Sequence, residues 1–152
     1  MRRFALWPVL LVMLLAASCT EKPATIDDFY TRPVRLPNGK IIRSEIMLHP
    51  TDMARGMMFR DSLAPGHGML FLHGEAGKYS YWMHNVRIPL DIIWMDKDRR
   101  IVEMSLHTPP CNRPSAKECP TYGGTVVAQV VLELPGGEAQ KQGLKLGDVL
   151  SF

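Results

Sequence analysis

The chain has 152 residues, of which 46% are apolar and 22% are charged, which suits one globular domain and excludes a chain too polar to fold. The formal net charge is +3, but removing Arg2 and Arg3 with a predicted signal sequence leaves 16 of the 18 basic residues against 15 acidic ones. A nucleic-acid-binding protein usually has a strong basic excess, so we expect no nucleic-acid partner.

The amino terminus has the pattern of a bacterial export signal. A short basic start precedes an uncharged, mostly apolar run over residues 4–17, which is shorter than the roughly 20 residues of a membrane-spanning helix. Ala16–Ser18 followed by Cys19 resembles the lipobox of bacterial lipoproteins, which implies removal of residues 1–18 and lipidation of Cys19. Two alternatives stay open: ordinary cleavage that leaves a free cysteine, and an uncleaved anchor.

The residue after the lipidated cysteine indicates the destination. In lipoproteins of Gram-negative bacteria a residue other than Asp at this position usually directs the protein to the outer membrane, and Thr20 fits that rule. We therefore expect a lipid-anchored protein of the cell envelope, on the outer membrane and facing the periplasm. Residues 19–39 are rich in proline and lack a sustained hydrophobic period, so they are predicted to be the lipidated cysteine and a tether, with at most an edge segment near residues 26–29.

The two cysteines of the predicted domain favour a disulfide. Without Cys19, the chain keeps Cys111 and Cys119, an even pair in a predicted exported protein. Their spacing excludes a CxxC redox motif, and two cysteines with no His between them make a poor zinc site. A disulfide that closes this short polar loop would stabilise the fold by roughly 2–3 kcal/mol.

Short apolar strands alternate with turn signals through the rest of the chain. In chain order, strands are predicted at residues 41–48, 68–72, 79–86, 90–95, 101–106, 125–134 and 148–152. The run 90–95 is almost wholly apolar, as in a strand buried on both faces, and forms a hairpin with 101–106. Short helices are predicted from Thr51 and from Pro135 to Gly143. The pattern predicts a mainly β fold, one compact sandwich or barrel-like domain with two short helices, over residues 40–152.

Five motifs follow one another through this predicted domain. They are Arg55–Arg60, Gly68–Phe71, Trp82–Ile92, Val131–Gly137 and Gly147–Asp148. Together they resemble the family filed as domain of unknown function 192, over about residues 40–152. The chain departs from the family at His84, where Lys is usual, at Val86, where Thr is usual, and in its added loop between Cys111 and Cys119. The resemblance implies a compact, mostly β domain and no established reaction.

The densest group of candidate binding residues lies in the third motif. Trp82 offers an aromatic platform, Asn85 a donor and an acceptor, and Asp91 a carboxylate after a proline turn. The full candidate site is Arg55, Arg60, Trp82, Asn85, Asp91 and Glu133 over an apolar floor of Met58, Met69 and Phe71. Such a mixture suits a small polar or sugar-like ligand. The alternative is that these residues have a structural role only. The same residue types occur where Arg pairs with a carboxylate, Asn holds a turn and Trp packs in the core.

We favour a non-catalytic binding or accessory module of the envelope, because no complete catalytic constellation is present. The alternative is a small hydrolase acting on envelope carbohydrate through Asp91 and Glu133. A weaker alternative is copper handling by His67, Met69, Met83 and His84, although Met also fills irregular cores. No phosphate-binding loop or other cofactor motif appears, so we expect no cofactor, and the sequence leaves the protein partners unknown.

Overall fold

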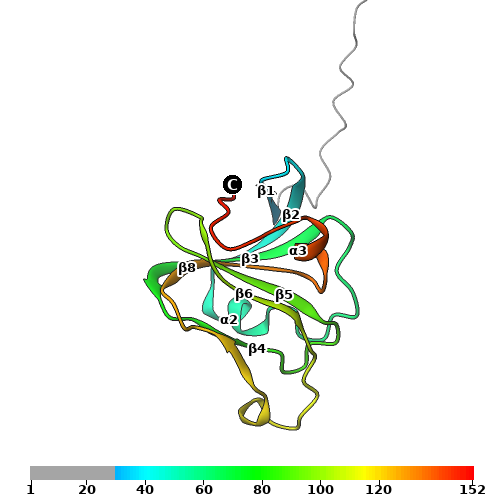
Figure 1. The fold of residues 1–152 in the computed structure, drawn as a ribbon. Coiled ribbons are helices and arrows are strands. Elements are labelled where there is room, and N and C mark those ends of the chain that lie inside the picture. Colours follow the sequence, from blue (N-terminus) through cyan, green and yellow to red (C-terminus); the bar gives the residue numbers. More distant parts are fainter. Residues whose placement is uncertain (1–29) are drawn as a thin grey trace, which may run out of the picture.

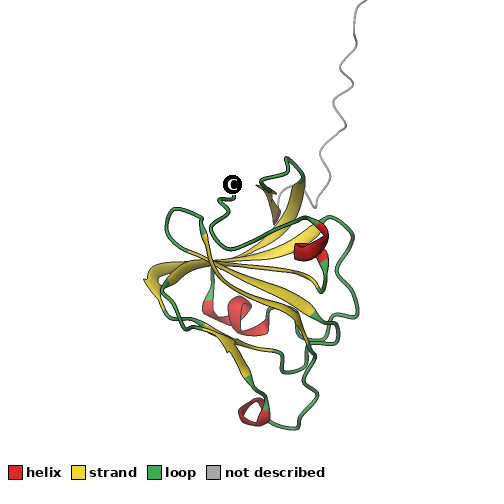
Figure 2. Cartoon of the chain, viewed as in Figure 1, coloured by secondary structure: helices red, strands yellow, loops and turns green. Residues whose placement is uncertain are grey.

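The computed structural model describes residues 30–152, so the predicted signal sequence, Cys19 and most of the predicted tether lie outside the described residues. The described chain folds into a six-stranded sheet, a two-stranded sheet and short helices, which confirms the predicted mainly β class (Figures 1 and 2). No helix within residues 30–152 is long and apolar enough to cross a membrane.

The large sheet is mixed. In spatial order its strands are β1 (Thr31–Arg35), β2 (Ile41–Met47), β3 (His67–Gly77), β8 (Ala128–Pro135), β5 (Leu90–Met95) and β6 (Ile101–Thr108). Only β2 and β3 pair in parallel; the other neighbours are antiparallel. Parallel neighbours need a crossover connection, and this one carries helix α2 (Pro50–Arg55) across one face of the sheet. Strand β8 lies between β3 and β5, near the middle of the sheet.

Smaller elements cover the two faces. On the α2 side lies the two-stranded sheet of β4 (Ser80–Trp82) and β7 (Thr121–Gly123) (Figure 1). The 3-10 helix η1 (Ala116–Glu118) comes just before β7 in the chain. On the opposite side lies α3 (Glu138–Lys141), whose Ala139 is fully buried. The predicted disulfide between Cys111 and Cys119 is present, with 5.9 Å between the Cα atoms, and both cysteines are buried on the α2 side.

Each face of the large sheet has its own core, because successive side chains in a strand point to opposite faces. On the α3 side, Leu70, Ile93 and Leu132 pack with β1, β2 and the carboxyl-terminal segment. On the α2 side, Phe71, Trp94 and Val131 pack with residues of α2, β4 and the disulfide loop. Every residue of β5 is buried, which confirms the strand predicted to be covered on both faces, and its hairpin with β6 is confirmed as well.

Three segments differ from the predicted elements. Strand β1 lies in the segment predicted as a tether, because Val34 and Leu36 bury their side chains in the core on the α3 side. The segment predicted as a closing strand instead makes isolated bridges, from Val149 to Arg100 and from Ser151 to Arg35. Of the predicted strand 79–86, only β4 is regular, and its partner β7 has no counterpart among the predicted strands.

Candidate functional site

A cavity of about 220 Å³ lies between α2 and the large sheet, and we call it the α2 cavity. Helix α2 and the turn after it supply Met53, Met57 and Met58, and strand β3 supplies Phe71. The turn approaches the sheet closely at Gly56, where φ is 42° and an added Cβ would lie 3.4 Å from Cζ of Phe71. The positive φ favours glycine at this position, where the chain passes beside the Phe71 ring, and the methionines and this ring give the cavity largely apolar walls.

Glu133 of β8 brings a carboxyl group to this apolar cavity. Its side chain is only 4% exposed, and its neighbours across the sheet are Met69 on β3 and Ile92 on β5. Oε2 has no hydrogen-bond partner among the described residues. Burial raises the pKa of Glu133 to about 8, because the charged form loses its hydration. At neutral pH the group is therefore mostly a neutral carboxylic acid, able to donate one hydrogen bond and to accept others.

The rings of His73, Tyr79 and Tyr81 supply further polar groups to the cavity. The hydroxyl of Tyr81 hydrogen-bonds Nε2 of His73 at 3.1 Å, and the His73 ring stacks on Tyr79 with 3.5 Å between centroids. Burial lowers the pKa of His73. Burial, and next the nearby Glu133, raise the pKa of Tyr81. All three rings line the cavity with Glu133, so its inner end offers hydrogen-bonding groups without a positive charge.

Two further predicted site residues lie at the solvent side of the cavity. Trp82 lines it and is 43% exposed, so this ring is not a core residue. Arg55, in the last turn of α2, also lines the cavity and is exposed. The structure thus brings together three of the six candidates, Arg55, Trp82 and Glu133, with Met58 and Phe71 of the predicted floor.

Arg60 and Asn85 do not line the cavity. The Arg60 guanidinium makes two hydrogen bonds to the Glu45 carboxylate, at 2.6 and 2.8 Å. Asn85 has a left-handed backbone with φ of 57°; its N–H donates to the carbonyl of Cys111, and its carbonyl accepts from the N–H of Phe59. Both residues therefore hold the chain around the site, which is the architectural alternative stated for them.

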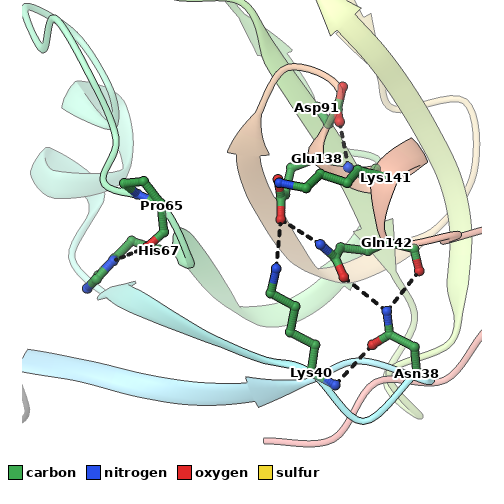
Figure 3. A network of polar contacts seen from close by, with 9 residues as sticks. Asn38, Lys40, Pro65, His67, Asp91, Glu138, Lys141 and Gln142 are labelled. Atoms are coloured by element: carbon green, nitrogen blue, oxygen red, sulfur yellow. Dashed lines mark hydrogen bonds and ion pairs between the residues drawn. The ribbon is translucent and has the colours of Figure 1, made fainter.

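Asp91 lies on the opposite face of the sheet, which corrects the prediction that it joins Arg60, Trp82 and Asn85 in one pocket. Its side chain is fully buried, and its two oxygens accept hydrogen bonds of 2.8 Å from the backbone N–H groups of His107 and Ala139. Asp91 thereby fixes the start of α3 (Figure 3). The reason is strand alternation: Leu90 and Ile92 face the α2 side, so the residue between them must face α3.

Around α3, a polar network joins the helix to the turn between β1 and β2. Lys40 contacts Glu138 at 3.4 Å, and the Asn38 amide donates to the side chain of Gln142 at 3.0 Å (Figure 3). Gln142 in turn donates to Glu138 at 2.8 Å. These contacts are exposed or half-buried and link elements of the fold, so we assign this cluster an architectural role.

Of the four residues considered for copper binding, the two methionines lie in the core and the two histidines contact backbone carbonyl oxygens. Met69 and Met83 are fully buried in the core of the α2 side. Nδ1 of His67 lies 3.2 Å from the carbonyl oxygen of Pro65, and Nε2 of His84 lies 3.1 Å from that of Arg113. Across residues 30–152, no group of three or more His, Cys, Asp or Glu side chains is arranged to hold a metal ion.

Sequence reasoning missed several residues of the cavity, above all His73, Tyr79 and Tyr81. The alternation of residues 79–86 indicated that Tyr79 and Tyr81 share a face, which is a usable signal for the tyrosines. His73 follows Phe71 by two positions on β3 and so shares its face, but the predicted strand ended at residue 72. A longer predicted strand would have added His73 to the candidate site.

The fold and the site define a small mixed-sheet β domain with one face hollowed around a buried acid. The chain belongs to the domain of unknown function 192 family, described as "Uncharacterized ACR", which matches residues 34–152. No curated protein matches it.

Two solved structures are similar to the chain. One is a protein of unknown function from Novosphingobium aromaticivorans, with 31% identity and a TM-score of 0.72, covering 80% of this chain and 85% of that one. The other is a putative transcription regulator from Sinorhizobium meliloti, with 27% identity and a TM-score of 0.68, covering 78% of this chain and 89% of that one. The family and the first relative carry no assigned activity in these descriptions.

Proposed function

We propose that the protein is a non-catalytic binding module that holds a small ligand in the α2 cavity. The observation that carries the proposal is Glu133, a carboxyl group that lines an open cavity while one of its buried oxygens lacks a partner. Buried polar groups in folded proteins are nearly always hydrogen-bonded, and exceptions concentrate at functional sites. A ligand that enters the cavity supplies the missing partner.

The walls define the ligand further. Phe71 and the methionines favour an apolar or ring-shaped body, and the exposed Trp82 offers a surface for stacking. The small polar or sugar-like ligand expected from the sequence is thereby narrowed to a molecule with one apolar face and one hydrogen-bonding end. We place this module in the cell envelope, where lipid on Cys19 and the segment that follows it anchor the domain to the membrane.

The arrangement of carboxylates favours binding over hydrolysis. Glycoside hydrolysis usually needs two carboxyl groups that face each other across the scissile bond. Asp91 and Glu133 point to opposite faces of the sheet, and Glu133 is the one acidic residue among the described residues that line the cavity. A single buried acid can donate or accept a hydrogen bond to a ligand without the second group of the catalytic pair.

The proposal is tested by titrating the domain with a set of neutral aromatic and sugar fragments. Binding is monitored through the NMR resonances of backbone and methyl groups. Fragments that bind should shift resonances of Phe71, Tyr81 and Glu133 as one group. Ala54 is exposed and lines the cavity, so Ala54→Trp should obstruct it and weaken binding by about tenfold or more. Gln140→Trp, at an exposed position of α3 on the opposite side, should leave binding unchanged. Shifts scattered over the surface, or full binding by Ala54→Trp, would contradict the proposal.

A further inference from the structure

Among the residues that the structure describes, no cation matches the carboxyl group at the inner end of the α2 cavity. Glu133 makes no ion pair within residues 30–152, and Arg55, the one Arg or Lys among the described residues that line the cavity, is exposed at the solvent side. A carboxylate in apolar surroundings is costly unless it is protonated or paired with a positive charge. A ligand with a positive charge would relieve this cost, whereas an uncharged ligand would leave the acid protonated.

The aromatic rings that line the α2 cavity with Glu133 suit a positive charge. Phe71, Tyr81 and Trp82 line the same cavity, and Phe71 and Tyr81 meet edge to face with 5.2 Å between centroids. The faces of aromatic rings attract cations, and organic ammonium groups are commonly bound by several such rings. A carboxyl group and aromatic rings together form a site for an ammonium group that is partly stripped of water.

We propose that the ligand of the α2 cavity carries an organic ammonium group, and that this group lies against Glu133 at the inner end. The inference rests on the proposed binding function and adds the chemical class of the ligand. Arg55 determines the orientation, because its guanidinium repels an ammonium group at the solvent side and so favours the inner end for the charge.

Binding then moves a proton. In the empty protein at pH 7, Glu133 is mostly protonated, because its pKa is about 8. When the ammonium enters, the O–H bond of Glu133 breaks, the proton leaves to solvent, and a carboxylate–ammonium pair remains. The other titratable or charged groups that line the cavity are His73, Tyr79, Tyr81 and Arg55. The pKa of His73 is lowered and that of Tyr81 is raised, so neither changes charge between pH 7 and pH 8.

The test compares benzylammonium with benzyl alcohol, two probes of nearly equal size that differ in charge. At pH 8 the domain should bind benzylammonium about tenfold or more tightly than the alcohol. Between pH 7 and pH 8 its affinity for benzylammonium should rise about fivefold, because a larger fraction of Glu133 has already lost its proton, while its affinity for benzyl alcohol should change less than about twofold. Calorimetry at pH 7 in two buffers of different ionisation enthalpy should show proton release with benzylammonium alone.

Two variants assign the effect to Glu133. Glu133→Gln keeps the shape and removes the charge, so it should abolish both the preference for benzylammonium and its rise with pH, and should still bind benzyl alcohol. Glu75→Gln removes the same charge from an exposed position and should behave as the unaltered protein. Equal affinities for the two probes in the unaltered domain, or a preference that survives in Glu133→Gln, would overturn the inference. Because the neutral fragments test the cavity separately, that outcome leaves the binding function standing; failure of every fragment and both probes would overturn both.

Discussion

Glu133 is the residue at which the fold departs most from ordinary packing. It occupies a central strand between Met69 and Ile92, where an apolar side chain would fit the core better. The acid is neutral at neutral pH because burial opposes its charge. Burying a carboxyl group without a hydrogen-bond partner lowers the stability of the fold. Such a loss of stability is typical of residues that bind a ligand rather than stabilise the fold.

The buried acid should make the stability of the domain fall as pH rises. The pKa of Glu133 is about 8 in the folded protein and about 4.5 without burial, so the folded state holds the proton more strongly. Its stability is therefore full below pH 4.5 and is lost as pH rises through 8, by roughly 3–5 kcal/mol for this one group. Glu133→Gln should lack that loss and become the more stable form above pH 8, measured by urea denaturation from pH 5 to pH 9. Parallel stability curves for the two proteins would contradict the account.

Asp91 is an equally buried acid with the opposite role. Both of its oxygens accept backbone hydrogen bonds, so its charge is compensated within the protein. Asp91→Ala should lower the free energy of unfolding by about 2–4 kcal/mol, because two buried N–H groups lose their acceptors. Asp91→Asn, which keeps one acceptor oxygen, should lose less. A loss below about 0.5 kcal/mol for Asp91→Ala, measured by thermal or urea unfolding, would refute the architectural assignment.

At the scale of elements, the cavity exists because α2 and β4 rest on one face of the large sheet. The sequence predicted the strand before α2, the helix itself and the buried strand β5, because apolar periodicity and turn residues are local signals. It did not predict that Asp91 and Glu133 lie on opposite faces, because this depends on the register between β5 and β8, in which Ile92 and not Asp91 lies opposite Glu133. We expected Asp91 at the rim of a pocket because it follows a proline turn. Asp91 belongs to strand β5, however, and its position in that strand determines the direction of its side chain.

Contacts between distant segments were beyond sequence reasoning. Strand β7 pairs with β4 across about forty residues, and Val34 and Leu36 reach a core whose other members begin at Ile42. Such pairings depend on how the whole sheet is assembled, which no local period records. Of the predicted site residues, Trp82, Glu133 and Arg55 line the cavity, and they were chosen from the family-like motifs and from residue chemistry.

The disulfide loop should stabilise the fold without taking part in the site. Cys111 and Cys119 are buried in the α2-side core and close a loop with a sequence separation of 8. Replacing both by Ser should cost about 2–3 kcal/mol of stability through the freed loop alone, and somewhat more from the lost apolar contacts. Denaturation measured with and without reductant provides the comparison, since the double variant should no longer respond to reductant. If the variant were as stable as the oxidised protein, the stabilising role would be wrong.

At the scale of the whole molecule, the two cores on the two faces of the large sheet differ in what they contain. The α3-side core is closed by α3, β1 and the carboxyl-terminal segment, and the buried Asp91 on this side accepts two backbone hydrogen bonds. The α2-side core contains the disulfide, the aromatic rings and the cavity. Both sides of the sheet thus stabilise the domain, and the α2 side also keeps room for a ligand, which is how a small domain combines stability with a functional site.

The location of the whole protein remains a prediction from its amino terminus, which lies outside the described residues. Mass spectrometry of the protein purified from a bacterial envelope should find a mature chain that begins at Cys19 with a diacyl or triacyl modification. Cys19→Ser should abolish the modification and release the domain from the membrane fraction. An unmodified chain that begins at another residue would contradict the lipoprotein prediction and leave the proposal for the cavity intact.

The central claim is that the α2 cavity keeps a neutral, unpaired acid ready for a ligand. The most direct test is an NMR titration that follows the side-chain carboxyl carbon of Glu133 with pH in the ligand-free domain, assigned by comparison with Glu133→Gln. We expect this carbon to titrate with a pKa of about 8, as burial without a partner requires. A pKa near the ordinary 4.5 would show that the carboxylate is hydrated or paired, and would contradict the account.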